Sequence, residues 1–106
     1  MKRTGLFIRR FLLKYGEAYV HEMWKAYCRH CKDYGYSSPS RQSFGNYVWM
    51  LKKLGLIRFL RSEVGQKGAM RHYYALNRKR IYDAAWRDPV KALGFRSRAG
   101  KKARKR

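Results

Sequence analysis

The residues with the sharpest chemical pattern are Cys28 and Cys31, which are separated by two residues. Cysteines at this spacing are common zinc ligands, and His21 and His72 would complete a set of two cysteines and two histidines. Structural zinc sites usually add a second closely spaced pair of ligands, whereas these histidines stand apart in the sequence. A redox pair would begin at a helix N-terminus, whereas this one falls late in a predicted helix. We therefore expect reduced thiols in a protein core and no metal or other cofactor.

Acidic side chains are too few and too scattered to predict catalysis. General acid–base chemistry and two-metal hydrolysis use carboxylates held close together, and no pair in this chain has such a spacing. The six acids are Glu17, Glu22, Asp33, Glu63, Asp83 and Asp88. The glycines at 65 and 68 enclose only Gln and Lys, which is typical of a turn rather than a phosphate-binding loop. We therefore expect no enzymatic activity and no small-molecule substrate.

The charge of the chain points to its partner. Its 106 residues include 27 Lys and Arg against 6 Asp and Glu, a formal net charge of +21. The sequence is nevertheless 45% hydrophobic and 16% aromatic, enough to form a packed core in one domain. So many cations around one core repel one another unless a polyanion neutralises them, and nucleic acid is the polyanion that we expect.

A membrane partner is disfavoured by the distribution of these charges. The basic residues run along the whole chain instead of gathering on one face of an amphipathic helix. No segment reaches the roughly 18 consecutive apolar residues that span a bilayer, and Arg9 and Arg10 interrupt what would be the apolar region of a signal peptide. We expect a cytoplasmic protein.

Hydrophobic periodicity predicts two helices in the first third of the chain, over residues 2–15 and 21–34. Gly16 and Gly35 follow them directly, where a left-handed C-terminal cap is expected. The predicted buried positions are Ile8, Phe11, Leu12 and Tyr15 in the first helix and Met23, Ala26, Tyr27 and His30 in the second.

A third helix is predicted over residues 39–54, with Ser38 as its N-cap and Pro39 at the first helical position. It ends at Gly55. Gly45, inside it, predicts a close approach by another backbone or by a partner. Its predicted buried stripe is Phe44, Tyr47, Val48, Leu51 and Leu54.

After Gly55 the period changes to two, which predicts strands over residues 56–62 and 70–76 joined by a basic turn. In the second strand, one face is expected to carry Met70, His72, Tyr74 and Leu76 and the other Arg71, Tyr73 and Ala75, so that one face can cover the helices while the other faces a ligand. A short helix is predicted over 80–87, and Asp88-Pro89 starts a brief turn that ends at Gly94. The predicted domain is 1–94, and residues 95–106 form a basic C-terminal arm that is disordered unless a polyanion binds it.

Three helices, the Ser-Pro start of the third, and the run 51–57 leading into a basic hairpin resemble the winged helix-turn-helix superfamily over residues 5–76. The resemblance implies a mainly α fold with a small β-hairpin (α+β), a three-helix core plus a two-stranded wing, followed here by a short C-terminal helix and a basic tail. In that superfamily the third helix is the recognition helix and the hairpin is the wing.

Carried onto this sequence, the resemblance makes Arg41, Gln42, Asn46 and Trp49 the exposed, groove-contacting face of the third helix. Arginine can contact guanine in a fork, and Gln or Asn can pair with adenine. Trp24, Trp49 and Tyr73 are candidates for stacking on unpaired bases. The predicted phosphate contacts are Lys52, Lys53, Arg61, Lys67, Arg71, Arg96, Arg98, Lys101, Lys102, Arg104, Lys105 and Arg106.

Two functions from different classes remain. Charge spread over every element favours a structural protein bound to folded RNA in a ribosome-like assembly, in contact with ribosomal proteins, because a regulator with this charge would bind DNA indiscriminately. The winged-helix resemblance favours a DNA-binding transcriptional regulator that reads the major groove with the helix at 39–54. We favour RNA over DNA on composition.

Overall fold

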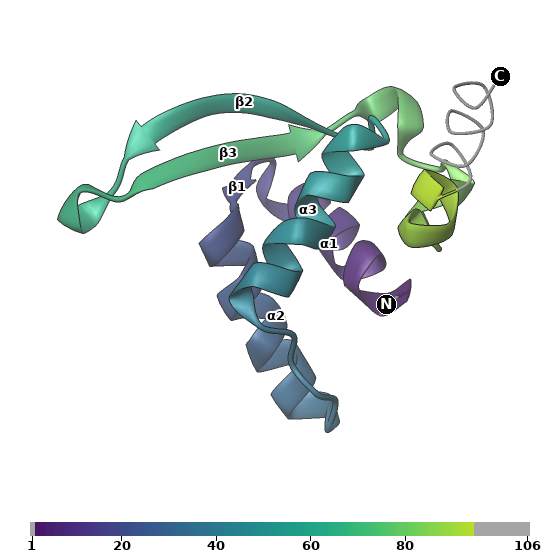
Figure 1. Ribbon diagram of the computed structural model, residues 1–106, viewed down its shortest axis with the longest axis horizontal. Coiled ribbons are helices and arrows are strands. Elements are labelled where there is room, and N and C mark those ends of the chain that lie inside the picture. The colour runs from purple at the N-terminus through teal and green to yellow at the C-terminus, as the bar shows by residue number, and fades with distance from the viewer. Residues whose placement is uncertain (1, 95–106) are drawn as a thin grey trace, which may run out of the picture.

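The computed structural model describes residues 2–94, which form an α+β fold of helices packed beside a three-stranded antiparallel sheet (Figure 1). This confirms the predicted class. Along the chain the elements are α1 (Lys2–Tyr15), β1 (Ala18–Tyr19), α2 (Val20–Tyr34), α3 (Arg41–Lys53), β2 (Ile57–Val64) and β3 (Met70–Leu76). Within these residues, none of the helices combines the length and the apolar character needed to cross a bilayer.

The first two helices agree with prediction, whereas the third starts later than expected. Gly16 and Gly35 have φ of 83° and 72°, the left-handed conformation that glycine adopts without strain. The N-cap of α3 is Ser40, whose hydroxyl accepts a hydrogen bond from the Ser43 amide at 3.1 Å, so the prediction of Ser38 as the cap is wrong. Pro39 lies just before the helix instead of at its first position.

The sheet has the strand order β1-β3-β2. Strand β1 was not predicted; its two residues pair with Tyr73 and Tyr74 of β3. The β2–β3 hairpin has a register irregularity between Phe59 and Arg61. Figure 1 shows this hairpin as a long arm that extends past the helices, with residues 66–68 at its tip.

Burial in β3 changes along the strand as well as between its two faces. Ala75 and Leu76 are both buried at its inner end, although they point to opposite sides of the strand. Met70 and His72 are exposed, and both line a groove together with residues of α2 and of the start of α3. Neither face of β3 is therefore buried along its whole length.

The core lies where the three helices meet the base of the hairpin. All five predicted positions of α3, from Phe44 to Leu54, are at most 2% exposed. In α1 the prediction fails for Tyr15, which is 57% exposed in the last turn and packs its ring against Phe11. In α2, Met23 and Tyr27 are buried, whereas Ala26 and His30 are half-buried.

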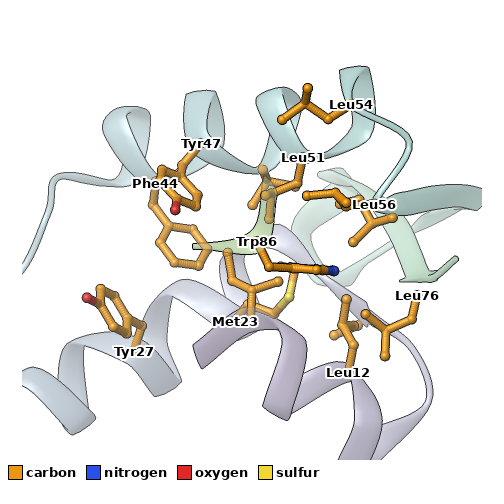
Figure 2. Close-up of a cluster of buried hydrophobic side chains, with 14 of the residues drawn as sticks. Leu12, Met23, Tyr27, Phe44, Tyr47, Leu51, Leu54, Leu56, Leu76 and Trp86 are labelled. Atoms are coloured by element: carbon orange, nitrogen blue, oxygen red, sulfur yellow. The ribbon is translucent and has the colours of Figure 1, made fainter. Parts of the chain in front are cut away.

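The segment after β3 closes this core. The predicted helix over 80–87 is wrong: the chain forms two short 3₁₀ turns, Arg78–Arg80 and Ala84–Trp86. Trp86 is fully buried among side chains of α1, α2 and α3 (Figure 2), and its indole nitrogen donates a hydrogen bond to the Arg80 carbonyl at 2.9 Å. Residues 89–94 are helical, and Asp88 caps them through the Lys91 amide. The predicted arm over 95–106 lies outside the described residues.

Trp86 can lie there because Gly5 has no side chain. A Cβ atom at Gly5 would be 2.8 Å from the Trp86 carbonyl oxygen and equally close to the Tyr47 hydroxyl. Both contacts are too short for real atoms. Gly5 therefore lets the segment after β3 pass directly against α1.

Candidate nucleic-acid interface

The outer face of α3 carries the four residues predicted to contact a groove. Arg41, Gln42, Asn46 and Trp49 are all exposed, and Trp49 is 54% exposed despite its large apolar ring. The Lys53 ammonium lies 5.4 Å from the centre of that ring. The predicted exposure is confirmed, and the contact with bases stays a prediction.

Gly45 lies open in the middle of this helix. A Cβ atom added there would meet nothing within 4 Å, so the predicted close approach by another part of the chain is wrong within the described residues. Its absent side chain lowers the surface of α3 between residues 41 and 49. The remaining prediction is that a partner approaches the backbone of α3 closely at Gly45.

A groove of about 750 Å³ continues from the start of α3 to the tip of the hairpin. Four cationic side chains line it, from α2, α3, the hairpin tip and β3. They are Lys25, Arg41, Lys67 and Arg71. No carboxylate from the described part of the chain lines the groove. The groove therefore attracts anions.

His21 also lines the groove, close to these positive charges. Its pKa is lowered from the ordinary histidine value by burial first, and then by the charges of Lys25, Arg41 and Arg71. Its Nδ1 atom is buried and has no hydrogen-bond partner among residues 2–94. The ring thus offers an unused polar atom next to the groove.

The Arg71 side chain packs against the Tyr19 ring and passes close to Gly65. Its guanidinium carbon lies 4.5 Å from the centre of the Tyr19 ring, and its Cδ lies 3.0 Å from where a Cβ of Gly65 would be. A larger residue at position 65 would push this arginine aside. From the sequence, Gly65 was predicted only as a turn residue, so its effect on Arg71 was missed.

Arg61, a predicted phosphate contact, is already paired. It donates hydrogen bonds to Glu17 and to Glu63, and its guanidinium covers the Tyr73 ring at 4.5 Å. Tyr73 also meets the Tyr19 ring edge-on at 5.4 Å and is half-buried. Both predicted contacts are therefore engaged within the sheet.

The other side chains predicted to contact nucleic acid differ in their exposure to solvent. Lys52, Lys53 and Lys67 are exposed, and Lys67 sits at the hairpin tip with a positive φ of 64°. Trp24 is half-buried and donates its indole N–H to the Pro39 carbonyl at 3.0 Å, so its choice as an exposed stacking residue is wrong. The arginines and lysines from Arg96 to Arg106 lie outside the described residues.

The structure does not bring the candidate zinc ligands together. Cys31 is buried in the core and Cys28 is half-buried on α2, both as free thiols. His72 lies on the hairpin, where its Nδ1 is 2.7 Å from the Ser62 hydroxyl. Among residues 2–94, no three His, Cys, Asp or Glu side chains are placed to hold a metal ion.

The groove also contains Lys25 and His21, which were not predicted from the sequence as ligand contacts. In the sequence, nothing distinguishes Lys25 from the other lysines, and His21 was considered only as a metal ligand. Their place in the groove depends on how the hairpin lies relative to the start of α2, which no local pattern shows. Compared with protein-family models, with curated proteins and with solved structures, the chain has no match.

Proposed function

We propose that this chain is a non-enzymatic, winged-helix nucleic-acid-binding protein. The order of its elements supports the assignment: three helices, with a short strand after the first, are followed by a hairpin that projects as an arm. In a winged helix the third helix and the hairpin contact the ligand. Here the open face of α3 and the groove beside the hairpin occupy these two positions.

The favoured ligand is folded RNA in a ribosome-like assembly, bound through phosphate contacts. One observation carries binding through phosphates: the groove between α3 and the hairpin tip combines Lys25, Arg41, Lys67 and Arg71 with no carboxylate of the described residues in its lining. RNA is favoured over DNA because cations are spread along the whole chain. Phosphate contacts need charge and reach but no base sequence. Cations on α1, α2 and the turns after β3 would meet other RNA segments or neighbouring proteins of the assembly.

A second candidate function, a transcriptional regulator, is favoured by the face of α3. Arg41, Gln42 and Asn46 are exposed together near the helix N-terminus, and these side-chain types pair with base edges in the major groove. Each good pair contributes about 1–3 kcal/mol of discrimination.

The test is to purify the untagged protein from its own cells at low salt and to sequence the bound nucleic acid, with sedimentation in parallel. Ribosomal RNA and co-sedimentation with ribosomes support the RNA proposal. A few discrete DNA sites and sedimentation apart from ribosomes support the regulator. If neither nucleic acid is enriched, both proposals fail.

A matched pair of variants connects this result to the groove. Arg41→Ala removes a groove cation, and Arg29→Ala removes an exposed arginine of α2 that lies outside the groove. We expect the first to lower the amount of bound nucleic acid more than the second. Equal losses would assign binding to net charge and not to the groove.

A further inference from the structure

A second pocket, of about 250 Å³, lies between α1 and the C-terminal end of α2. It shares no lining residue with the groove beside the hairpin. Aromatic rings and arginines make most of its wall, and no carboxylate of the described residues lines it. The residues that matter are Arg3, Phe7, Arg10, His30, Tyr34 and Tyr36.

The rings of this pocket form a connected row. Phe7 lies 5.1 Å from His30, His30 lies 4.7 Å from Tyr34, and Tyr34 lies 6.1 Å from Tyr36 between ring centres. The two tyrosine rings are nearly parallel, at 17°. Only the inner end of this row is covered by the protein.

The outer end of the row faces solvent. Tyr34 is 66% exposed and Tyr36 is 40% exposed. Tyrosine rings at such a position present a flat apolar surface, which a planar ligand can cover by stacking. Neither the core nor the sheet uses these rings.

Arginines stand beside the exposed rings. The guanidinium carbon of Arg3 lies 3.6 Å from the centre of the Tyr36 ring, and Arg10 is exposed on the same wall. A guanidinium that is stacked on a ring keeps its N–H donors at the edge, where they can bind phosphate. The pocket thus offers a stacking surface and phosphate donors side by side.

We infer that this pocket binds one unpaired nucleotide of RNA, with its base stacked on Tyr34 and its phosphate at Arg3 and Arg10. Unpaired bases are recognised by stacking on aromatic rings and on arginine planes, because the π-face of every base is available once it leaves a helix. The inference rests on the proposed function, since the same folded RNA occupies the groove with its paired segments and this pocket with a bulged or looped nucleotide.

The test uses an RNA hairpin with one bulged 2-aminopurine and the same hairpin without the bulge, titrated with the full chain. We expect the bulged RNA to bind about tenfold more tightly and its fluorescence to be quenched by stacking. Tyr34→Ala removes both effects and leaves binding of the unbulged hairpin unchanged. The matched control is Tyr82→Ala, which removes a tyrosine that is 91% exposed elsewhere and changes neither effect.

Two results overturn the inference, and they differ from each other. If the wild-type chain binds both hairpins equally, or if Tyr34→Ala keeps the preference and the quenching, the pocket proposal fails while the proposed function stands. If the wild-type chain binds neither hairpin, the proposed RNA function fails and the pocket proposal fails with it. Tyr34→Phe keeps the ring and should retain the preference, which separates stacking from loss of folding.

Discussion

Arg61 and Glu17, which are 44 residues apart in the sequence, form a two-point ion pair with N–O distances of 3.2 and 2.5 Å. The pair joins β2 to the loop between α1 and β1. It lowers the pKa of Glu17, mainly through the hydrogen bonds from Arg61, and Arg61 in turn has a raised pKa. Exposed ion pairs contribute little to stability. The clearer effect is that a basic protein keeps one arginine neutralised.

We expect Glu17→Gln to strengthen nucleic-acid binding. The change frees part of the Arg61 guanidinium, which then makes about one more phosphate contact and steepens the salt dependence of log K by about one for a duplex ligand. Affinity measured between about 50 and 200 mM salt tests this. Asp33→Asn is the control, because it changes the charge equally at an exposed residue away from β2. Equal effects of both changes would show that only net charge matters.

We expect His21 to make nucleic-acid binding depend on pH. Its pKa is lowered in the free protein, so the ring stays neutral until the pH falls below the ordinary histidine value. Bound phosphates offset the charges of Lys25, Arg41 and Arg71, which raises the pKa again. Binding then takes up a proton, and affinity increases as the pH falls through the histidine range. An NMR titration of the His21 ring with and without RNA measures both pKa values.

The free protein should respond to pH in the opposite direction. Because the unfolded chain binds the His21 proton more readily than the folded chain, stability decreases as the pH falls through the ordinary histidine range. His21→Gln is expected to reduce both effects. An unchanged His21 pKa on RNA binding would contradict the location of phosphate in this groove.

Gly65→Ala should weaken binding through Arg71. The backbone of Gly65 is extended and accepts alanine, but the added Cβ meets the Arg71 side chain and forces it off the Tyr19 ring. We expect a loss of affinity close to that of Arg71→Ala, with a small change in the free energy of unfolding. If Gly65→Ala binds as well as wild type, Arg71 does not contact the ligand from its observed position.

Gly45→Ala should separate stability from binding. Nothing in the chain opposes a Cβ there, so alanine stabilises α3 by about 1 kcal/mol, read from chemical denaturation. A partner that approaches the bare backbone is pushed away, so affinity falls. Tighter or equal binding by the more stable variant would place the ligand elsewhere.

Trp86→Ala should destabilise the fold by about 3–5 kcal/mol, because it empties the centre of the core. Chemical denaturation followed by circular dichroism measures this. The control is Trp49→Ala, which removes an exposed tryptophan and should change the free energy of unfolding by about 0.5 kcal/mol or less. A similar loss in both variants would contradict the buried position of Trp86.

The sequence predicted the helices and the hairpin because their signals are local. The buried stripe of α3 recurs at helical spacing, and Gly16 and Gly35 mark helix ends by the left-handed conformation that they allow. It failed at β1, whose two residues are strand only because Tyr73 and Tyr74 pair with them. It also missed the burial of Trp86, which depends on space left by Gly5, far away in the chain.

The candidate site was likewise predicted only in part. Exposure of Arg41 and Trp49 follows from helical periodicity and was foreseen. The groove was not, because it forms only where the hairpin tip comes near Lys25. The engagement of Arg61 and Trp24 was not predictable either, since their partners lie in other elements.

The position of β2 affects how the chain meets other molecules. As an outer strand of the sheet, β2 has one row of backbone groups unpaired within the described residues, a template on which another chain could add a strand. Exposed Arg58, Arg61 and Glu63 line this strand, and the irregularity at Phe59 interrupts its flatness. Charged, uneven edges resist strand addition and aggregation. The outer edge of β2 is therefore poorly suited to pair with a second chain, and its side chains are what it presents to other molecules.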